Sequence, residues 1–155
     1  MFNTIGIITK RQDITSEETA RELGAFLKKL GVLVVEGNKS IEKTADLIIV
    51  VGGDGSILST ARTYVDSNIP ILGINLGRLG FLADVSVESM VNVVTDILNG
   101  DYIKEQRALL SCQLEREGNI LSSRSRDFSL AIEASSLISI CSSFCCFCFF
   151  FFVII

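Results

Sequence analysis

The sequence predicts an α/β fold, a doubly wound parallel sheet, and three observations carry that prediction. Short apolar segments alternate with segments whose apolar residues recur at helical spacing, as in parallel sheets with helices on both faces. One short segment, Leu47 to Val51, is apolar throughout, which is typical of a strand covered on both faces. It ends in a glycine-rich turn ahead of another helical segment, the position at which open α/β sheets bind ligands.

The first strand, helix and second strand follow one another directly. Residues 4–9 are apolar and β-branched, so they predict a buried strand. The next segment shows helical spacing, and Thr15 with Glu18 three residues later predicts a capping box at its start. Gly31 fits the position after a helix end, and residues 32–35 predict the second strand.

The later elements repeat this alternation. We predict a helix over about residues 56–65 and a strand over 71–74, after the turn around the single Pro of the chain. Ser86 is the predicted cap of a further helix that includes residues 90–98 and ends at Gly100. Residues 1–101 are therefore expected to form an α/β nucleotide-binding domain.

The pattern changes near residue 102. Residues 108–115 favour a strand, and residues 117–121 favour a hairpin, so residues 102–127 are interpreted as the beginning of a β-rich second domain. Residues 128–155 form an apolar tail rich in Phe and Cys with one charge, Glu133. The abrupt change in composition predicts that this tail is non-native or disordered, and the alternative is a genuine hydrophobic anchor or interaction segment.

Composition excludes several functions. The 155 residues hold 14 Lys plus Arg, 18 Asp plus Glu and no His, for a formal charge of −4, which argues against nonspecific nucleic-acid binding. Without His there is no Ser-His-Asp triad, and we expect no metal site formed by the protein's own side chains. The first residues do not resemble a targeting signal. We therefore expect a cytoplasmic protein with reduced thiols.

The strongest local signal is the turn formed by Gly52, Gly53, Asp54 and Gly55. Glycines allow the backbone to approach a phosphate chain, and the following helix offers free N–H groups and a positive dipole end. Asp54 would then lie within reach of a substrate hydroxyl or a metal ion. From composition alone, a tight turn with a capping Asp is an equally good interpretation. The turn matches neither the dinucleotide fingerprint nor a Walker A loop.

A second signal lies in the loop from Asn75 to Leu82, where Gly77 and Gly80 flank Arg78 and precede Phe81. A flexible loop with an aromatic side chain can cover a nucleobase, although Phe81 taken alone is more often a core residue. Basic residues near the two signals could neutralise phosphate, although each is more often a surface charge; these are Lys10, Arg11, Arg62 and Arg78.

Together the two stretches resemble the NAD kinase family, especially its bacterial members, over about residues 1–125. The matching pieces are residues 50–56, VVGGDGS, and residues 74–84, INLGRLGFLAD. The GGDG motif alone is also similar to that of diacylglycerol and sphingosine kinases. The second stretch favours NAD kinases.

The resemblance implies an NAD kinase/diacylglycerol kinase-like N-terminal fold and ATP-dependent phosphorylation of the 2′-hydroxyl of the adenosine ribose of NAD, which gives NADP. It implies ATP, NAD and a divalent ion, Mg²⁺, as cofactors, and a homo-oligomer in the intact family. Asp54 would be the proton acceptor for the hydroxyl. The implied nucleotide-binding residues are Gly52, Gly53, Asp54, Gly55, Asn75, Arg78 and Phe81.

The resemblance stops after about residue 125. NAD kinases continue with an Asn-Glu or Asn-Asp pair and a Thr-Pro-Thr-Gly-Ser-Thr-Ala-Tyr-like segment, and neither occurs here. We therefore expect a truncated second domain and a weakly active or inactive chain. The alternatives are a GGDG-type lipid kinase and a non-catalytic nucleotide-binding fragment tethered by its apolar tail.

Overall fold

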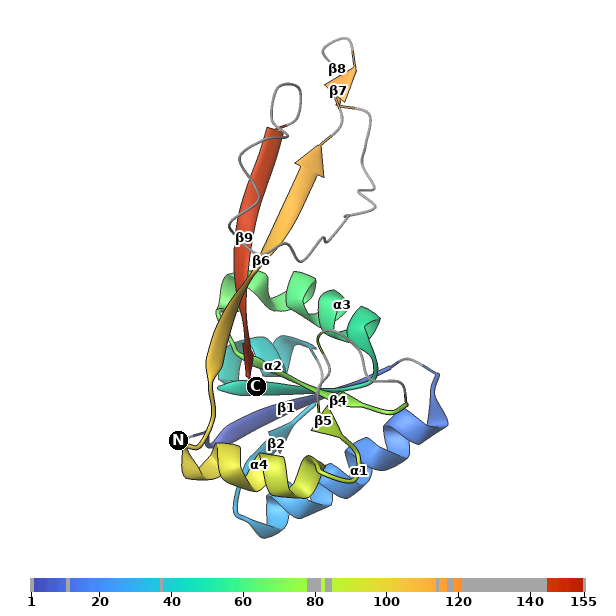
Figure 1. Cartoon of the computed structure of the whole chain (residues 1–155), viewed down its shortest axis with the longest axis vertical. Coiled ribbons are helices and arrows are strands. Elements are labelled where there is room, and N and C mark those ends of the chain that lie inside the picture. The colour runs from blue at the N-terminus through green and yellow to red at the C-terminus, as the bar shows by residue number, and fades with distance from the viewer. Residues whose placement is uncertain are drawn as a thin grey trace. The chain divides into compact units, whose positions relative to one another are not determined.

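The structure is a computed structural model that describes residues 2–10, 12–36, 38–77, 82, 85–113, 115–116, 119–120 and 145–154 (Figure 1). Strands and helices alternate over the first hundred residues, as the sequence predicts. In chain order the elements are β1 (Thr4–Thr9), α1 (Ile14–Lys29), β2 (Leu33–Val35), α2 (Asn38–Thr44), β3 (Leu47–Val51), α3 (Asp54–Tyr64), a 3₁₀ turn (Val65–Ser67), β4 (Ile71–Asn75), β5 (Val85–Ser86), α4 (Met90–Asn99), β6 (Lys104–Gln113), β7 (Glu115–Arg116), β8 (Asn119–Ile120) and β9 (Cys145–Ile154).

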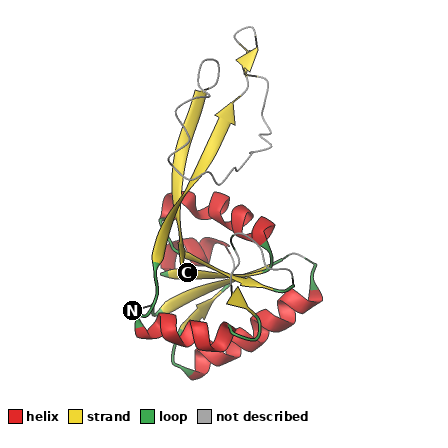
Figure 2. Ribbon diagram, in the orientation of Figure 1, coloured by secondary structure: helices red, strands yellow, loops and turns green. Residues whose placement is uncertain are grey.

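The central sheet is parallel over its first four strands, in the order β2-β1-β3-β4. The short strand β5 adds to β4 in the same direction. Helices α1 and α4 cover one face of this sheet, and α2 and α3 cover the other (Figure 2). The predicted doubly wound α/β sheet is therefore confirmed.

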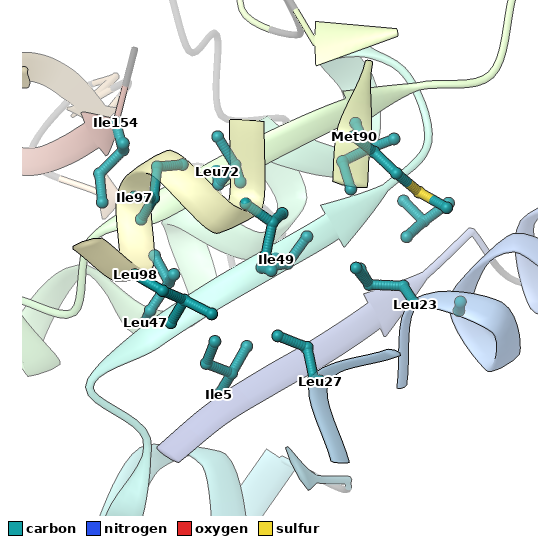
Figure 3. Close-up of a cluster of buried hydrophobic side chains, with 14 residues drawn as sticks. Ile5, Leu23, Leu27, Leu47, Ile49, Leu72, Met90, Ile97, Leu98 and Ile154 are labelled. Atoms are coloured by element: carbon teal, nitrogen blue, oxygen red, sulfur yellow. The ribbon is translucent and has the colours of Figure 1, made fainter. Parts of the chain in front are cut away.

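The main core lies between the sheet and the helices α1 and α4 (Figure 3). Alternate strand residues such as Ile5, Ile49 and Leu72 point to this face and are almost completely buried. Leu27 of α1 and Ile97 of α4 pack against them. Full burial of each such side chain contributes about 1.5–3 kcal/mol, so this layer supplies much of the driving force that holds the sheet together.

The start of α1 differs from the prediction. Asp13 is the N-cap, and its Oδ1 accepts a hydrogen bond from the N–H of Ser16 at 3.3 Å. The predicted capping box of Thr15 and Glu18 is therefore wrong, because aspartate caps a helix as well as threonine does and the chain is extended at Asp13. Gly31 has a φ of +81°, which confirms the predicted helix end.

Two more helices depart from their predicted limits, and one was not predicted. The helix α4 has Ser89 at its N-cap position, not Ser86, and Gly100 ends it with a φ of +100°. The helix α3 begins at Asp54, two residues earlier than expected. The unpredicted helix is α2, whose seven residues hold only one strongly apolar side chain, Ile41.

The chain divides into two compact units, Met1–Glu105 with Phe152–Ile155, and Gln106–Phe151. In the first unit the end of β9 pairs with β4, with Val153 opposite Ile71, and Ile154 is buried. In the second unit β7 and β8 form an antiparallel hairpin, with Glu115 opposite Ile120.

The tail holds β9, whereas its composition led us to expect a non-native or disordered segment. Its β-branched and aromatic residues fit a strand well. The domain limits and the non-native origin of the tail stay predictions. Among the residues that the structure describes, no helix combines the length and the apolar character needed to cross a bilayer.

Candidate functional site

The glycine-rich turn leaves β3 at its carboxyl end and passes straight into α3. All five residues of β3 are buried, so this strand holds the turn on a rigid support. The N–H of Gly52 donates to the carbonyl oxygen of Ile74 in β4 at 2.9 Å. Gly53 is the N-cap of α3, and Asp54 is its first residue. The turn therefore opens at the edge where parallel sheets bind their ligands.

The three glycines of this turn have different roles in the packing. A Cβ atom on Gly52 would lie 2.7 Å from Oγ and 3.0 Å from Cβ of Ser56, whereas a Cβ atom on Gly53 or Gly55 would meet nothing within 4 Å. Gly52 is also buried, and the other two are exposed. Gly52 thus permits the close approach of the turn to α3, and Gly53 and Gly55 leave open space beside Asp54.

Asp54 connects the two stretches that the sequence singled out. Its Oδ1 accepts a hydrogen bond from the backbone N–H of Leu82 at 3.1 Å. Leu82 follows Asp54 by 28 residues and is buried. The end of the second stretch is therefore held against the first, and the carboxylate of Asp54 has a fixed orientation.

Asn75 lies at the same edge as the last residue of β4, which neighbours β3 with Ile74 opposite Val51. Its side chain is buried, and its Oδ1 accepts from the N–H of Gly77 at 3.1 Å. This local bond turns the chain as it leaves β4. Arg78 and Phe81, the other predicted binding residues of this loop, lie outside the described residues.

The basic residues proposed to neutralise phosphate lie at different distances from the glycine-rich turn. Lys10 lies beside the turn, since its N–H points at the carbonyl oxygen of Val51 at 3.3 Å. Its side chain is 61% exposed and pairs with Asp13 at 3.4 Å. Arg62 lies in the last turn of α3, about 12 Å along the helix from Asp54 at 1.5 Å per residue. Arg11 and Arg78 lie outside the described residues; of the two candidates within them, Lys10 is the one that lies beside the turn.

A cavity of about 270 Å³ adjoins the turn. It begins at Lys10 and Gly55 and continues along α3 to Tyr64. The hydroxyl of Tyr64 is buried and has no hydrogen-bond partner within the described part of the chain. Burial, and then the negative charge of Glu42, raise the pKa of Tyr64 above its usual value. The cavity gives a ligand at the turn a neighbouring space lined partly by hydroxyl groups.

The described residues supply few ligands for a metal. None of the His, Cys, Asp and Glu side chains among them form a group of three that could hold an ion. Magnesium commonly binds through one or two carboxylates together with substrate phosphates and water. The turn formed by residues 52–55 holds one carboxylate, that of Asp54.

Two contributors to this site were missed by the sequence analysis. They are the backbone N–H of Leu82 and the hydroxyl of Ser16, which lies between the ends of β1 and β3. A backbone donor leaves no trace in the residue type. Ser16 directly follows Thr15, and the predicted capping box assigned a role to the hydroxyl of Thr15 instead of that of Ser16.

Comparison with known proteins shows which family the sequence resembles. Residues 33–102 match the family model described as the ATP-NAD kinase N-terminal domain. The chain is 42% identical to the NAD kinase of Teredinibacter turnerae over 137 residues, which cover 78% of this chain and 47% of that protein. It is 39% identical to the NAD kinase of Hydrogenovibrio crunogenus over 139 residues, which cover 78% of this chain and 48% of the relative.

Solved structures share the fold. Yeast NADH kinase complexed with NADH has a TM-score of 0.65 at 19% identity and covers 76% of this chain, which spans 44% of that structure. An NAD kinase from Archaeoglobus fulgidus in complex with ATP has a TM-score of 0.54 at 27% identity. The match covers 70% of this chain and 42% of that structure. The resemblance to the N-terminal part of NAD kinases is confirmed, and the chain spans about half the length of these relatives.

Proposed function

We propose that the chain contributes the α/β half of an NAD kinase site, at which ATP phosphorylates the 2′-hydroxyl of the adenosine ribose of NAD. One observation carries the proposal: the hydrogen bond from Leu82 to Asp54 joins the GGDG turn to the second matched stretch. The names of the reported proteins support it: both sequence relatives are NAD kinases, and the two solved structures are an NADH kinase with NADH and an NAD kinase with ATP.

In this proposal Asp54 orients the ribose hydroxyl and accepts its proton. Phosphoryl transfer has a loose transition state, so positioning matters more than a strong base. An ionised carboxylate has two oxygens and accepts several hydrogen bonds, including one from a hydroxyl donor. It can therefore align the hydroxyl with the phosphorus and take the proton late, as the new bond to phosphorus forms.

The turn itself would bind the phosphate groups. Gly53 and Gly55 are exposed, with no atom near their Cβ positions, so a phosphate can approach the backbone there. The N-terminus of α3 adds the N–H groups of its first turn and the positive end of its dipole. Lys10 adds a positive charge at the edge of the same space.

The other contributions follow from the resemblance. Asn75, Arg78 and Phe81 would contact the nucleotides, with Phe81 near the adenine. Magnesium would arrive with ATP and neutralise phosphate charge. A cytoplasmic location and a homo-oligomer complete the proposal. Since the chain spans about half the length of its relatives, we expect weak turnover from the chain by itself.

The test is NADP formation by the purified full chain with NAD, ATP and magnesium, together with NAD and ATP titrations. Asp54→Asn removes the proposed acceptor, and Asp66→Asn makes the same change at an exposed aspartate after α3. We expect Asp54→Asn to lower turnover by about 10²- to 10⁴-fold and Asp66→Asn to leave it unchanged. Equal turnover in both variants would refute the role of Asp54. A folded chain that neither makes NADP nor binds NAD or ATP would refute the proposed function.

A further inference from the structure

A buried serine lies where β1 and β3 end. Ser16 in α1 is completely buried. Its Oγ donates to the carbonyl oxygen of Val51 at 2.7 Å and accepts from the N–H of Lys10 at 3.0 Å. Thr9 and Val51 are the last paired residues of the two strands. The Ser16 hydroxyl therefore links β1 and β3 one residue beyond their last backbone pair.

The position of Ser16 is fixed independently of the turn. Its own N–H donates to Oδ1 of the helix cap Asp13 at 3.3 Å, and α1 packs on the core through Leu23 and Leu27. The hydroxyl thus projects from a rigid helix onto two chain segments. Because Val51 immediately precedes Gly52, its carbonyl is the last backbone group before the turn.

The direct backbone contact at this point is long. The N–H of Lys10 approaches the carbonyl oxygen of Val51 at 3.3 Å, near the limit for an N–H···O bond. The 2.7 Å bond from Ser16 is typical of a good O–H···O geometry. The hydroxyl is consequently the stronger of the two links that hold this carbonyl.

We propose that Ser16 is a positioning residue for Asp54, and that its hydroxyl sets the direction in which the chain leaves β3. This inference rests on the proposed function. Ser16 touches neither Asp54 nor the proposed substrates; it acts through the carbonyl of Val51 and the turn that follows. Loss of the Ser16 hydroxyl lets the segments after β1 and β3 separate and moves Asp54 away from the ribose 2′-hydroxyl of NAD.

The experiment compares the full chain with Ser16→Ala, which removes the hydroxyl, and Ser16→Thr, which keeps it. Ser89→Ala is the matched control, because the hydroxyl of Ser89 donates only to Ser86 within its own turn. Residue-resolved amide hydrogen exchange is measured together with kcat and KM for NAD. The exchange measurement does not depend on activity.

We expect Ser16→Ala to accelerate exchange at Lys10 and Gly52, whose N–H groups are hydrogen-bonded, by about fivefold or more, as loss of one hydrogen bond allows. The kcat should fall by about ten- to a hundredfold, with KM for NAD within about twofold. Ser16→Thr should restore both, even where its added methyl group lowers the melting temperature. Ser89→Ala should leave the exchange of Lys10 and Gly52 unchanged.

Uniform acceleration over β1, β3 and β4 would show that Ser16 only stabilises the fold, and it would overturn the inference. Unchanged exchange at Gly52 would overturn it as well, as would loss of NAD affinity at constant kcat. If the unmodified chain is folded but neither makes NADP nor binds NAD or ATP, the proposed function fails separately. The exchange pattern then still decides whether Ser16 positions the turn.

Discussion

Gly52→Ala tests the close packing of the turn against α3. The added Cβ would lie 2.7 Å from Oγ and 3.0 Å from Cβ of Ser56. Rotation of the Ser56 hydroxyl relieves only the first contact, because the Cβ is fixed by the helix backbone. The turn or the first residues of α3 must therefore shift.

The magnitude follows from overpacking in a buried position. Such changes cost about 1–3 kcal/mol, which corresponds to a fall of about 3–9 °C in Tm for a chain of this size. Gly55→Ala is the matched control, since its Cβ meets nothing within 4 Å and lies in α3. Alanine in a helix is about 0.5–1 kcal/mol more favourable than glycine, so the control should be stabilised slightly.

The assay is urea unfolding followed by circular dichroism, with Gly52→Ala also placed in a Ser56→Gly background. Removing both Ser56 atoms should reduce the cost of Gly52→Ala to less than about 1 kcal/mol, a coupling typical of residues in contact. The reasoning would be refuted if Gly52→Ala and Gly55→Ala had equal stability. The same conclusion would follow from a cost that Ser56→Gly leaves unchanged.

Three further predictions concern the rest of the domain. Gly6→Ala should cost about 1–3 kcal/mol in urea unfolding, because its Cβ would lie 2.9 Å from Ile41 of α2; Ile41→Ala should relieve that clash, and additive costs would contradict the contact. Asp46→Ala should cost about 1–3 kcal/mol, because Asp46 accepts from two N–H groups at the start of β1 at 2.7 and 3.1 Å; an unchanged Tm would argue against that bond. Tyr64→Phe should retain or raise stability at neutral pH, since it removes a buried hydroxyl without a partner among the described residues. Because burial and Glu42 raise the pKa of Tyr64 above 10.0, the neutral form favours the folded state, and this contribution is complete below pH 10 and lost as pH rises toward the folded-state pKa. Unfolding measured between pH 9 and 11 should therefore show a steeper loss in the unmodified chain than in Tyr64→Phe, and parallel curves would contradict the assignment.

Much of the architecture was predictable from the sequence. The unbroken apolar run of β3 predicted a strand covered on both faces, and the glycines after it predicted a turn at the ligand-binding edge. Helical spacing located α1 and α4, and Gly31 and Gly100 marked their ends. These features are local, because periodicity and glycine positions act within one element.

Local patterns could not predict α2. Its seven residues include only one strongly apolar side chain, so no amphipathic pattern predicts this helix. The helix is stabilised by Ile41, which packs closely against Gly6 of β1. Its existence therefore depends on a strand more than thirty residues away in the chain.

The sequence by itself indicated where the candidate site lies. It singled out Asp54 and the loop after Asn75 from their residue types and from the family they resemble. The tertiary structure alone decided how these residues are held. The bonds from Leu82 to Asp54 and from Ser16 to Val51 join segments 28 and 35 residues apart, and such bonds form only when the order β2-β1-β3-β4 brings the strand ends together. Strand order is set by the packing of the whole domain, and no local pattern specifies it.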